Sequence, residues 1–382
     1  MKNTICDKNK CTACGACLNI CPKKCVYYKK DGVGHLYPVI DESKCIHCHA
    51  CEKVCQVLHP LELEKPKTAY AGWHQDVEQY KSSTSGGAAT AFAQKIISEG
   101  GVVYGCAWGK DLDVEHVRID TLHDICRLKG SKYVQSKISN NILAQVKRDL
   151  KSDLKVLFIG TPCQIAGLKS YLRKDYDNLF LADLICHGVP PVSLLKKHVK
   201  RIAGTLKNVQ VSFRDEKGMS LKITRAGHVI YNKHLWLERY QDSYYNSFID
   251  GYIYRDSCFI CRYASSNRIS DVTIGDFWGL GDDFKIKHDY GCSCILPITN
   301  KGLQLVREAH LDIYERSVEE AVRGNSQLRS PFARNRRINL FRFLIVFSGF
   351  RLAYFITNFD YLWTVFRCKM KIGTRIKKML GR

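Results

Sequence analysis

Residues 11–22 read CTACGACLNICP, and residues 45–55 read CIHCHACEKVC. Both stretches follow the pattern Cys-x2-Cys-x2-Cys-x3-Cys, and the second begins 34 residues after the first. Three thiolates at this spacing can hold one face of a cubane iron–sulfur cluster, and the fourth, carried away by a helical turn, reaches the other cluster. The repeat therefore predicts a small domain folded around two 4Fe-4S clusters.

The pattern assigns each cluster four ligands. The predicted ligands of the first cluster are Cys11, Cys14, Cys17 and Cys55. The predicted ligands of the second cluster are Cys45, Cys48, Cys51 and Cys21. Between the motifs, residues 26–28 and 36–39 flank Lys30-Asp31-Gly32, which indicates a β-hairpin. A pair of zinc sites is the alternative, but zinc sites usually combine two C-x2-C units.

These motifs resemble the bacterial two-cluster ferredoxin. One departure is Gln56, which stands where a proline usually follows the last Cys, whereas Pro22 keeps the proline of the first motif. Cys6 and Cys25 lie outside the pattern, and we expect neither to be a ligand.

The thiols are concentrated at one end of the chain. Ten of the 19 Cys lie in the first 55 of 382 residues, and the N-terminus has no apolar run typical of a secretory signal. Many thiols without export indicate a reducing compartment and metal binding rather than disulfides. We therefore expect a cytoplasmic protein.

After Pro66 the pattern changes to alternating strands and helices. Strands are predicted at 68–73, 101–108, 114–119, 155–159, 179–185, 268–279 and 292–298, a β-meander at 207–231, and helices in most intervals. This order is typical of a mixed, largely parallel α/β sheet. The predicted fold class is α+β and α/β, in four parts: a ferredoxin domain (1–62), two regions of a mixed, largely parallel α/β domain (67–205 and 206–328) and a helical basic tail (329–382).

Two kinds of site are predicted in the α/β region. Ser85-Gly86-Gly87 stands at the start of a predicted helix. The free backbone N–H groups there can bind a phosphate, and the alternative is an ordinary helix cap without a ligand. Cys163 and Cys186 each follow an apolar strand, at the sheet edge where ligands bind in such folds. With the C-x2-C pair Cys258 and Cys261 they make four thiols, a full ligand set for a third cluster. A zinc site and unlinked thiols are the alternatives. Cys292 and Cys294 are expected to pack in the core.

Six motifs in this order resemble the coenzyme F-420 hydrogenase/dehydrogenase beta-subunit family. The motifs are Ser83–Gly87, Gly130–Ser136, Gly160–Gln164, Cys186–Pro191, Cys258–Cys261 and Arg268–Gly279, and the resemblance spans about Thr68 to Leu328. It implies FAD and a 4Fe-4S cluster in this region. It also implies a flavin-binding role for Ser85, Gly86, Gly87, Lys132, Tyr133, Gln135 and Ser136.

The leading functional hypothesis is therefore a flavin-dependent oxidoreductase supplied by its clusters. The alternatives are a non-catalytic electron-transfer subunit and a scaffold with degenerate sites, against which the intact eight-Cys pattern argues. The redox partner could be ferredoxin, F-420 or a nicotinamide. No general acid or base stands out, and the substrate is not indicated.

The tail carries half of the formal net charge of +22, because residues 334–382 hold twelve Lys/Arg and one Asp, a net +11. Residues 340–363 are rich in aromatic and aliphatic side chains, but Arg342, Arg351 and Asp360 interrupt them. This pattern favours a helix at the inner surface of an anionic membrane, or one packed on the body or a partner, over a full span. Nucleic acid is not expected, because no recognition motif accompanies the charge.

Overall fold

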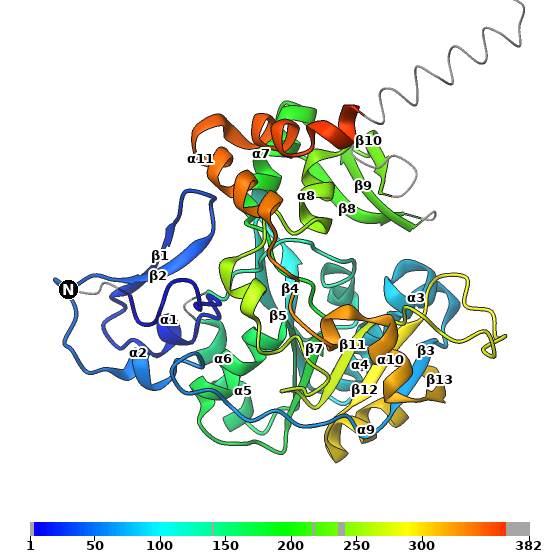
Figure 1. Ribbon diagram of the computed structural model, residues 1–382. Helices are drawn as coiled ribbons and strands as arrows, with labels where there is room; N and C mark the ends of the chain where they lie inside the picture. The colour runs from blue at the N-terminus through cyan, green and yellow to red at the C-terminus, as the bar shows by residue number, and fades with distance from the viewer. Residues whose placement is uncertain (1–3, 140, 216–217, 236–240, 364–382) are drawn as a thin grey trace, which may run out of the picture.

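The computed structural model describes residues 4–139, 141–215, 218–235 and 241–363. Three predicted features lie partly outside these residues: the start of the helix expected from Asn140, the meander turn at 216–217, and the tail beyond residue 363. The described chain forms a small Cys-rich domain, an eight-stranded sheet with helices, and a separate three-stranded sheet beneath a long C-terminal helix (Figure 1).

The N-terminal domain contains the expected hairpin. Strands β1 (Val26–Lys30) and β2 (Leu36–Ile40) pair antiparallel, and helices α1 (Ala16–Ile20) and α2 (Ala50–Lys53) each begin inside a Cys motif. The two motifs also share a backbone conformation, because φ is positive at Ala13 and at the equivalent His47. It is positive again at Gly15 and at the equivalent His49. Non-Gly residues rarely adopt this region, so the shared conformation shows that both loops are built for the same purpose.

The large sheet has the strand order β13-β3-β12-β11-β7-β6-β4-β5. The four central strands β11, β7, β6 and β4 run parallel to one another. Every other pair of neighbouring strands in this sheet is antiparallel. The mixed α/β sheet is thus confirmed, with the parallel part confined to the four central strands. The strands are β3 (Ala69–His74), β4 (Val102–Trp108), β5 (Val114–Ile119), β6 (Val156–Gly160), β7 (Leu179–Leu184), β11 (Val272–Asp276), β12 (Ser293–Pro297) and β13 (Leu311–Arg316).

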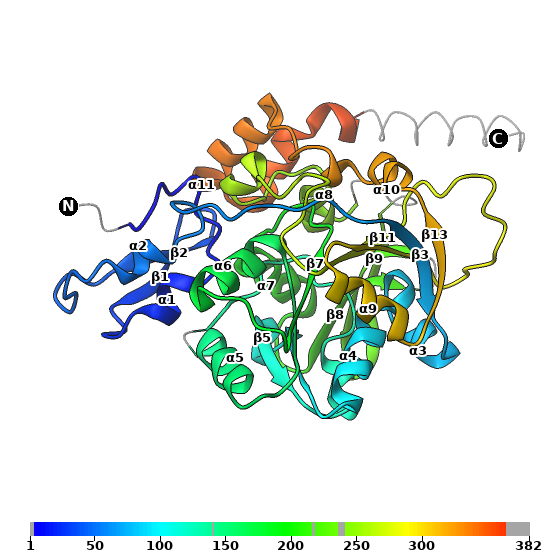
Figure 2. The ribbon, with the colours of Figure 1, turned by 90° about the horizontal axis from the view of Figure 1, so that it is seen from below.

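Helices cover both faces of this sheet (Figure 2). Helices α4 (Ala88–Ser98) and α9 (Asn300–Glu308) share one apolar core with the sheet, and α5 (Ile142–Lys151) and α6 (Pro162–Leu172) share another. Ala16 and Val54 of the N-terminal domain belong to the second core. The Cys-rich domain is therefore packed onto the α5–α6 side of the sheet. Helices α3 (Val77–Ser82) and α10 (Val318–Gly324) lie near β3 and β13.

The predicted meander forms the second sheet, from β8 (Val209–Asp215), β9 (Gly218–Arg225) and β10 (His228–His234). It shares a core with α7 (Val192–Ala203), α8 (Ser243–Ile249) and α11 (Arg336–Thr357). The predicted tail helix is present as α11, in which the chain folds back on itself at Gly349, where φ is 74°. Arg337 in its first half pairs with Asp360, which follows its second half, whereas a continuous helix would place these two residues about 35 Å apart.

Candidate functional site

Two small cavities in the N-terminal domain are each lined by one predicted set of four thiols. The first has Cys11, Cys14, Cys17 and Cys55 in its wall, and about 330 Å³ free of protein atoms. The second has Cys21, Cys45, Cys48 and Cys51, and about 340 Å³. In each cavity the fourth Cys comes from the opposite motif, as the spacing predicts. Four thiols around one cavity fit the ligand requirement of a 4Fe-4S cluster.

The two Cys outside the motifs lie beside these cavities. Cys6 lines the first cavity and Cys25 the second. The Cys25 thiol lies 3.3 Å from the Cys21 Sγ. The structure therefore places both thiols, which the spacing predicts to be bystanders, as neighbours of the predicted ligands.

The third set of four thiols also converges. Cys163 follows β6 and Cys186 follows β7, and these neighbouring strands are parallel, so both Cys lie at one edge of the sheet. Cys258 and Cys261 come from the 3₁₀ turn η4 (Asp256–Ile260) and the residue after it. The four thiols are mutual neighbours, and burial raises the pKa of Cys163 to about 11 and that of Cys258 to about 12.

These raised thiol pKa values keep the four groups protonated near neutral pH unless a metal centre binds them as thiolates. Within the described residues, no group of three or more His, Cys, Asp or Glu side chains is arranged to hold a single metal ion. Four Cys thiols are the usual ligands of a 4Fe-4S cluster, so the third set has the ligand type and number for one.

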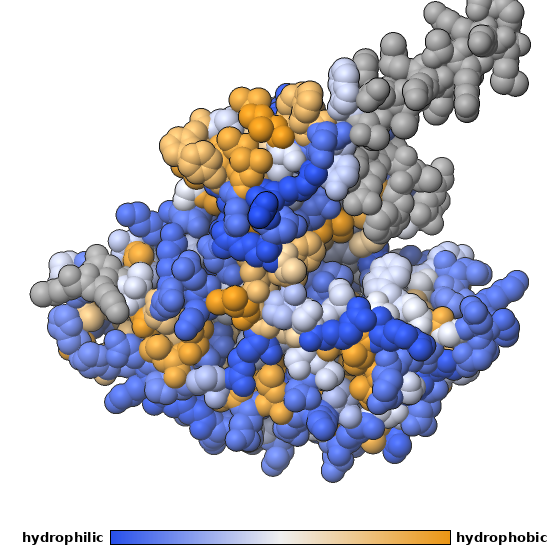
Figure 3. Space-filling model, viewed as in Figure 1, coloured by the Kyte–Doolittle hydropathy of each residue, from blue (hydrophilic) through white to orange (hydrophobic). Residues whose placement is uncertain are grey.

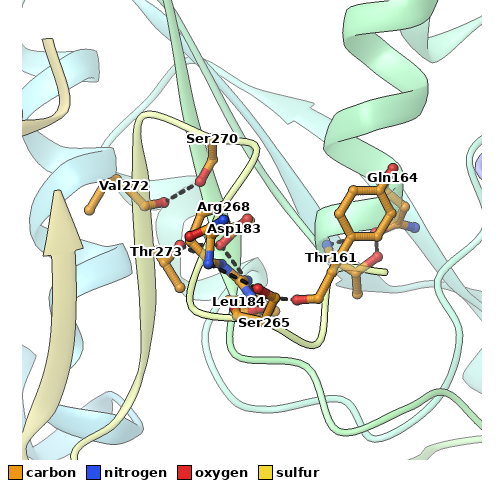
Figure 4. Close-up of polar contacts among 11 residues, drawn as sticks. Thr161, Gln164, Asp183, Leu184, Ser265, Arg268, Ser270, Val272 and Thr273 are labelled. Carbon is orange, nitrogen blue, oxygen red and sulfur yellow. Dashed lines mark hydrogen bonds and ion pairs between the residues drawn. The ribbon is translucent and has the colours of Figure 1, made fainter. Parts of the chain in front are cut away.

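A buried ion pair fastens the end of β7, which leads to Cys186, to the loop that follows Cys261 (Figure 4). Arg268 Nη2 lies 2.9 Å from Asp183 Oδ1 at the end of β7, and both side chains are inaccessible to solvent. The same guanidinium donates to the carbonyl oxygens of Tyr263 and Leu184. Tyr263 lies two residues after Cys261, and Leu184 two residues before Cys186. Arg268 therefore fixes the loop relative to the strand end.

Arg255 joins the first and third sets of thiols. Its side chain is fully buried, and its Nε donates to the carbonyl oxygen of Cys11 at 2.7 Å. Its own carbonyl accepts from the Cys258 N–H at 3.0 Å. The two sets also meet directly at α6, where a Cβ added to Gly167 would lie 2.8 Å from Cys14 Sγ. The closeness of Cys14 to Gly167 leaves no room for a side chain at position 167.

A cavity beside the third set contains part of the predicted flavin site. It has about 1110 Å³ free of protein atoms, including its open mouth, and lies between α4, the 128–136 segment and the ends of β6 and β11. Of the predicted residues, Ser85, Gly87, Lys132 and Ser136 line it.

The other predicted flavin residues lie elsewhere. Gly86 packs against β12 and β3, since an added Cβ would lie 2.6 Å from Ser293 N and 2.7 Å from Gly72 O. Tyr133 packs on Phe248 with ring centroids 4.8 Å apart. Gln135 accepts from Arg255 Nη1 at 3.0 Å, at the contact with the N-terminal domain. These three residues are absent from the cavity wall.

Lysines give the cavity a positive character. Lys132 Nζ donates to the carbonyl oxygens of Leu128, Lys129 and Gly130, at 3.1, 3.0 and 3.0 Å. Burial lowers the pKa of Lys132, because the charged form is poorly solvated there. Among the described residues, the cavity wall includes Lys129 and Lys132 and no Asp or Glu. The cavity thus favours an anionic ligand.

His116 is a lining residue that the sequence did not reveal. Its Nε2 donates to the carbonyl oxygen of Ile159 at 3.0 Å, so its Nδ1 accepts from Ser136 Oγ at 3.2 Å. Gln164 Nε2 in turn donates to Ser136 Oγ at 2.9 Å. Burial lowers the pKa of His116 to about 4. The imidazole is therefore neutral near pH 7 and holds Ser136 and Gln164 in fixed positions.

Thr161 connects the cavity with the third set. It lines the cavity, and its Oγ1 lies 3.3 Å from Cys163 Sγ. It also forms a capping box with Gln164 at the start of α6. A ligand in the cavity and a cluster on the third set would be separated by little more than this residue.

Comparisons with known proteins match two parts of the chain. Residues 10–58 match a 4Fe-4S dicluster domain. Residues 153–320 match the family model for the C terminus of the beta subunit of coenzyme F-420 hydrogenase/dehydrogenase. No curated protein matches this chain. Among solved structures, a chain of the F-420-reducing NiFe hydrogenase complex from Methanosarcina barkeri is 19% identical, with a TM-score of 0.47, over 69% of this chain and 91% of that chain.

Proposed function

Because this chain contains a 4Fe-4S dicluster domain followed by the C-terminal domain of coenzyme F-420 hydrogenase/dehydrogenase beta subunits, we propose that it is an iron–sulfur flavoprotein. In this proposal it passes electrons between a soluble one-electron partner and FAD in the Lys132 cavity. The reaction at the cavity is a two-electron reduction or oxidation of a substrate or of the deazaflavin F-420.

The spatial order of the thiol sets carries the proposal. The motif from Cys45 to Cys51 lies at the surface, with Cys48 exposed. Cys51 of this second set is close enough to Cys17 of the first set for their charges to interact, and so is Cys14 of the first set to Cys163 of the third. Thr161 then leads from Cys163 to the cavity. The order supports a path from a surface cluster to an internal two-electron site.

The cavity residues would hold the flavin through their charge and backbone. Lys132 would act through its charge alone, since its Nζ already donates to three backbone carbonyls. Ser85 and Gly87 precede α4, whose first backbone N–H groups favour an anion. A bound flavin supplies the exchange between hydride chemistry and single electrons, which clusters alone do not. The His116–Ser136–Gln164 hydrogen bonds would keep the floor of the cavity rigid.

The exposed second set is where a partner would deliver electrons. Ile46 and Leu58 are exposed apolar side chains on this domain, and the Cys48 thiol is exposed between them in sequence. A small soluble donor such as ferredoxin fits this surface, and F-420 or a nicotinamide would meet the flavin at the cavity. We further propose a cytoplasmic location, where a reducing environment keeps the many thiols available for metal binding.

Cofactor analysis after anaerobic purification tests the proposal. We expect released FAD close to one per chain by chromatography, together with a flavin band in the visible spectrum. The second candidate function is an electron-transfer subunit that performs no substrate chemistry, and it is favoured by the same path of thiols. Protein that keeps its iron after reconstitution with FAD, but holds no flavin, would exclude the flavoenzyme and leave the relay.

A further inference from the structure

Helix α11 and the residues that follow it expose an apolar surface, seen over α11 in Figure 3. Phe347 is 76% exposed, Phe343 64% and Trp363 49%. The exposed apolar residues of this surface are Leu340, Phe343, Val346, Phe347, Leu352, Phe355, Ile356, Phe359, Tyr361 and Trp363. Soluble monomers rarely expose a contiguous apolar patch of this kind, so this surface is built to be covered. We call these ten residues the α11 outer face.

The opposite side of α11 is fixed in the protein core. Ile338, Phe341 and Tyr354 are buried in the core that includes α7 and α8. Arg342 Nη1 donates to the carbonyl oxygen of Tyr254 at 2.7 Å, and its Nη2 lies 2.8 Å from Asp256 Oδ1. These contacts hold the helix flat against the body.

Length and composition alone would allow α11 to cross a membrane. Crossing would remove its buried side chains from the core and break the Arg342–Asp256 ion pair. The fold-back at Gly349 also divides α11 into two shorter helical segments, and Phe341 of the first contacts Phe350 of the second. A helix with one packed face and one apolar exposed face suits a position in the plane of a membrane surface.

The charge of this part of the chain identifies the kind of surface. Arg336 and Arg351 are exposed on α11. Residues 364–382, which follow directly in the sequence, contain seven Lys/Arg and no Asp or Glu. Phe, Tyr and Trp are favoured at the headgroup level of a bilayer, and basic clusters beside such segments bind anionic lipids. A protein partner of neutral surface would leave this positive charge unmatched.

We propose that the α11 outer face docks on an anionic lipid bilayer, with its aromatic side chains at headgroup level and the basic residues on phosphate groups. The proposal is independent of the redox function, since it concerns a surface distant in sequence from the thiol sets and can be measured with the clusters in place. It would make the protein peripheral at the membrane.

Vesicle sedimentation of the full-length, cluster-loaded protein tests this. The vesicles contain either phosphatidylcholine alone or phosphatidylcholine with phosphatidylglycerol. We expect binding to the anionic vesicles, at least tenfold weaker binding to the neutral ones, and release as salt is raised. Phe343→Asp/Phe347→Asp should reduce the partition coefficient at least tenfold, and Lys377→Glu/Lys378→Glu should reduce it several-fold.

The matched control is Val77→Asp/Leu122→Asp, which adds the same charge at two exposed apolar residues elsewhere. This variant should bind as the unmodified protein does, and all variants should keep the visible spectrum of the clusters. The proposal is overturned if the unmodified protein does not bind anionic vesicles, or binds neutral vesicles equally well. It is also overturned if Phe343→Asp/Phe347→Asp binds as well as the control variant.

Discussion

Gln56 Oε1 accepts a 2.6 Å hydrogen bond from the hydroxyl of Tyr263. Gln56 follows Cys55 of the first thiol set, and Tyr263 lies two residues after Cys261 of the third. The amide of Gln56 also donates to Thr12 Oγ1 at 2.9 Å. The residue that replaces the usual ferredoxin proline is thus a polar link between two domains, with both Gln56 and Tyr263 buried.

Tyr263→Phe tests this link. The substitution removes the hydroxyl and leaves the buried Gln56 Oε1 without its donor, so the free energy of unfolding should fall by about 1–3 kcal/mol. Anaerobic denaturant titration measures the change. Tyr37→Phe is the matched control, because Tyr37 is buried and its hydroxyl has no hydrogen-bond partner among the described residues. Equal effects of the two substitutions would show that the Gln56–Tyr263 contact contributes nothing.

Cys258→Ser/Cys261→Ser tests the third cluster. Three four-iron clusters predict about twelve irons per chain, and the variant should hold about eight, because two of the four thiolates of the third set are lost. Iron and acid-labile sulfide analysis gives the count. Cys126→Ser, which changes an exposed thiol outside all three sets, should keep the full count. A double variant that retains its iron would mean that no cluster is bound there.

Lys132→Met tests the charge of the cavity. The side chain keeps its length, but the buried ammonium is lost, so FAD should bind at least tenfold more weakly, or about 1.4 kcal/mol. Fluorescence titration of the flavin-free protein measures the dissociation constant. Lys110→Met, at an exposed lysine outside the cavity wall, should leave it unchanged. Unaltered affinity in Lys132→Met would place the flavin phosphates or ring away from this residue.

His116 predicts a dependence of stability on pH. Its pKa is about 4 in the folded protein and 6.5 when unfolded, so the unfolded chain binds more protons between these values. Stability should therefore fall as the pH is lowered, and from pH 7 to 5.5 this one group accounts for about 1 kcal/mol.

Unfolding of His116→Gln over the same pH range checks this contribution. The variant should lose about 1 kcal/mol less than the unmodified protein between the two pH values. His228→Gln, at an exposed histidine on β10, is the control and should follow the unmodified protein. Parallel curves for all three proteins would mean that His116 is not a buried neutral group.

Local patterns in the sequence were sufficient for much of the architecture. The Cys spacing predicted which four thiols share each N-terminal cavity, because the motif encodes its own loop and helix. Apolar runs that end in Cys163 and Cys186 predicted two parallel strand ends at one edge. Cys292 and Cys294 are buried in the core, as alternation along β12 predicted.

The flavin residues show where local patterns are insufficient. Lys132, Val134 and Ser136 line the cavity, whereas Tyr133 and Gln135 do not. Alternate side chains of residues 132–136 thus line the cavity, whereas the prediction assigned neighbouring residues of this motif to one ligand. Alternation could have separated the two groups.

Contacts between residues far apart in the chain could not be predicted from the sequence. His116 comes from the edge strand β5 and reaches the cavity by bonding to Ile159 on β6, although β4 lies between these strands. Arg255 and Gln56 act across a domain contact that no spacing along the chain describes. Their roles depend on how the N-terminal domain is packed on α6.

We propose that the surface cluster of the second thiol set, the two internal thiol sets and the Lys132 cavity form one electron path. An anaerobic reductive titration of the protein, after incubation with FAD and removal of unbound flavin, tests it most directly when followed by visible absorbance. Three one-electron clusters and one two-electron flavin predict about five electron equivalents per chain, with the flavin band lost in the same titration. An end point near two equivalents, with no flavin band to bleach, would contradict the account.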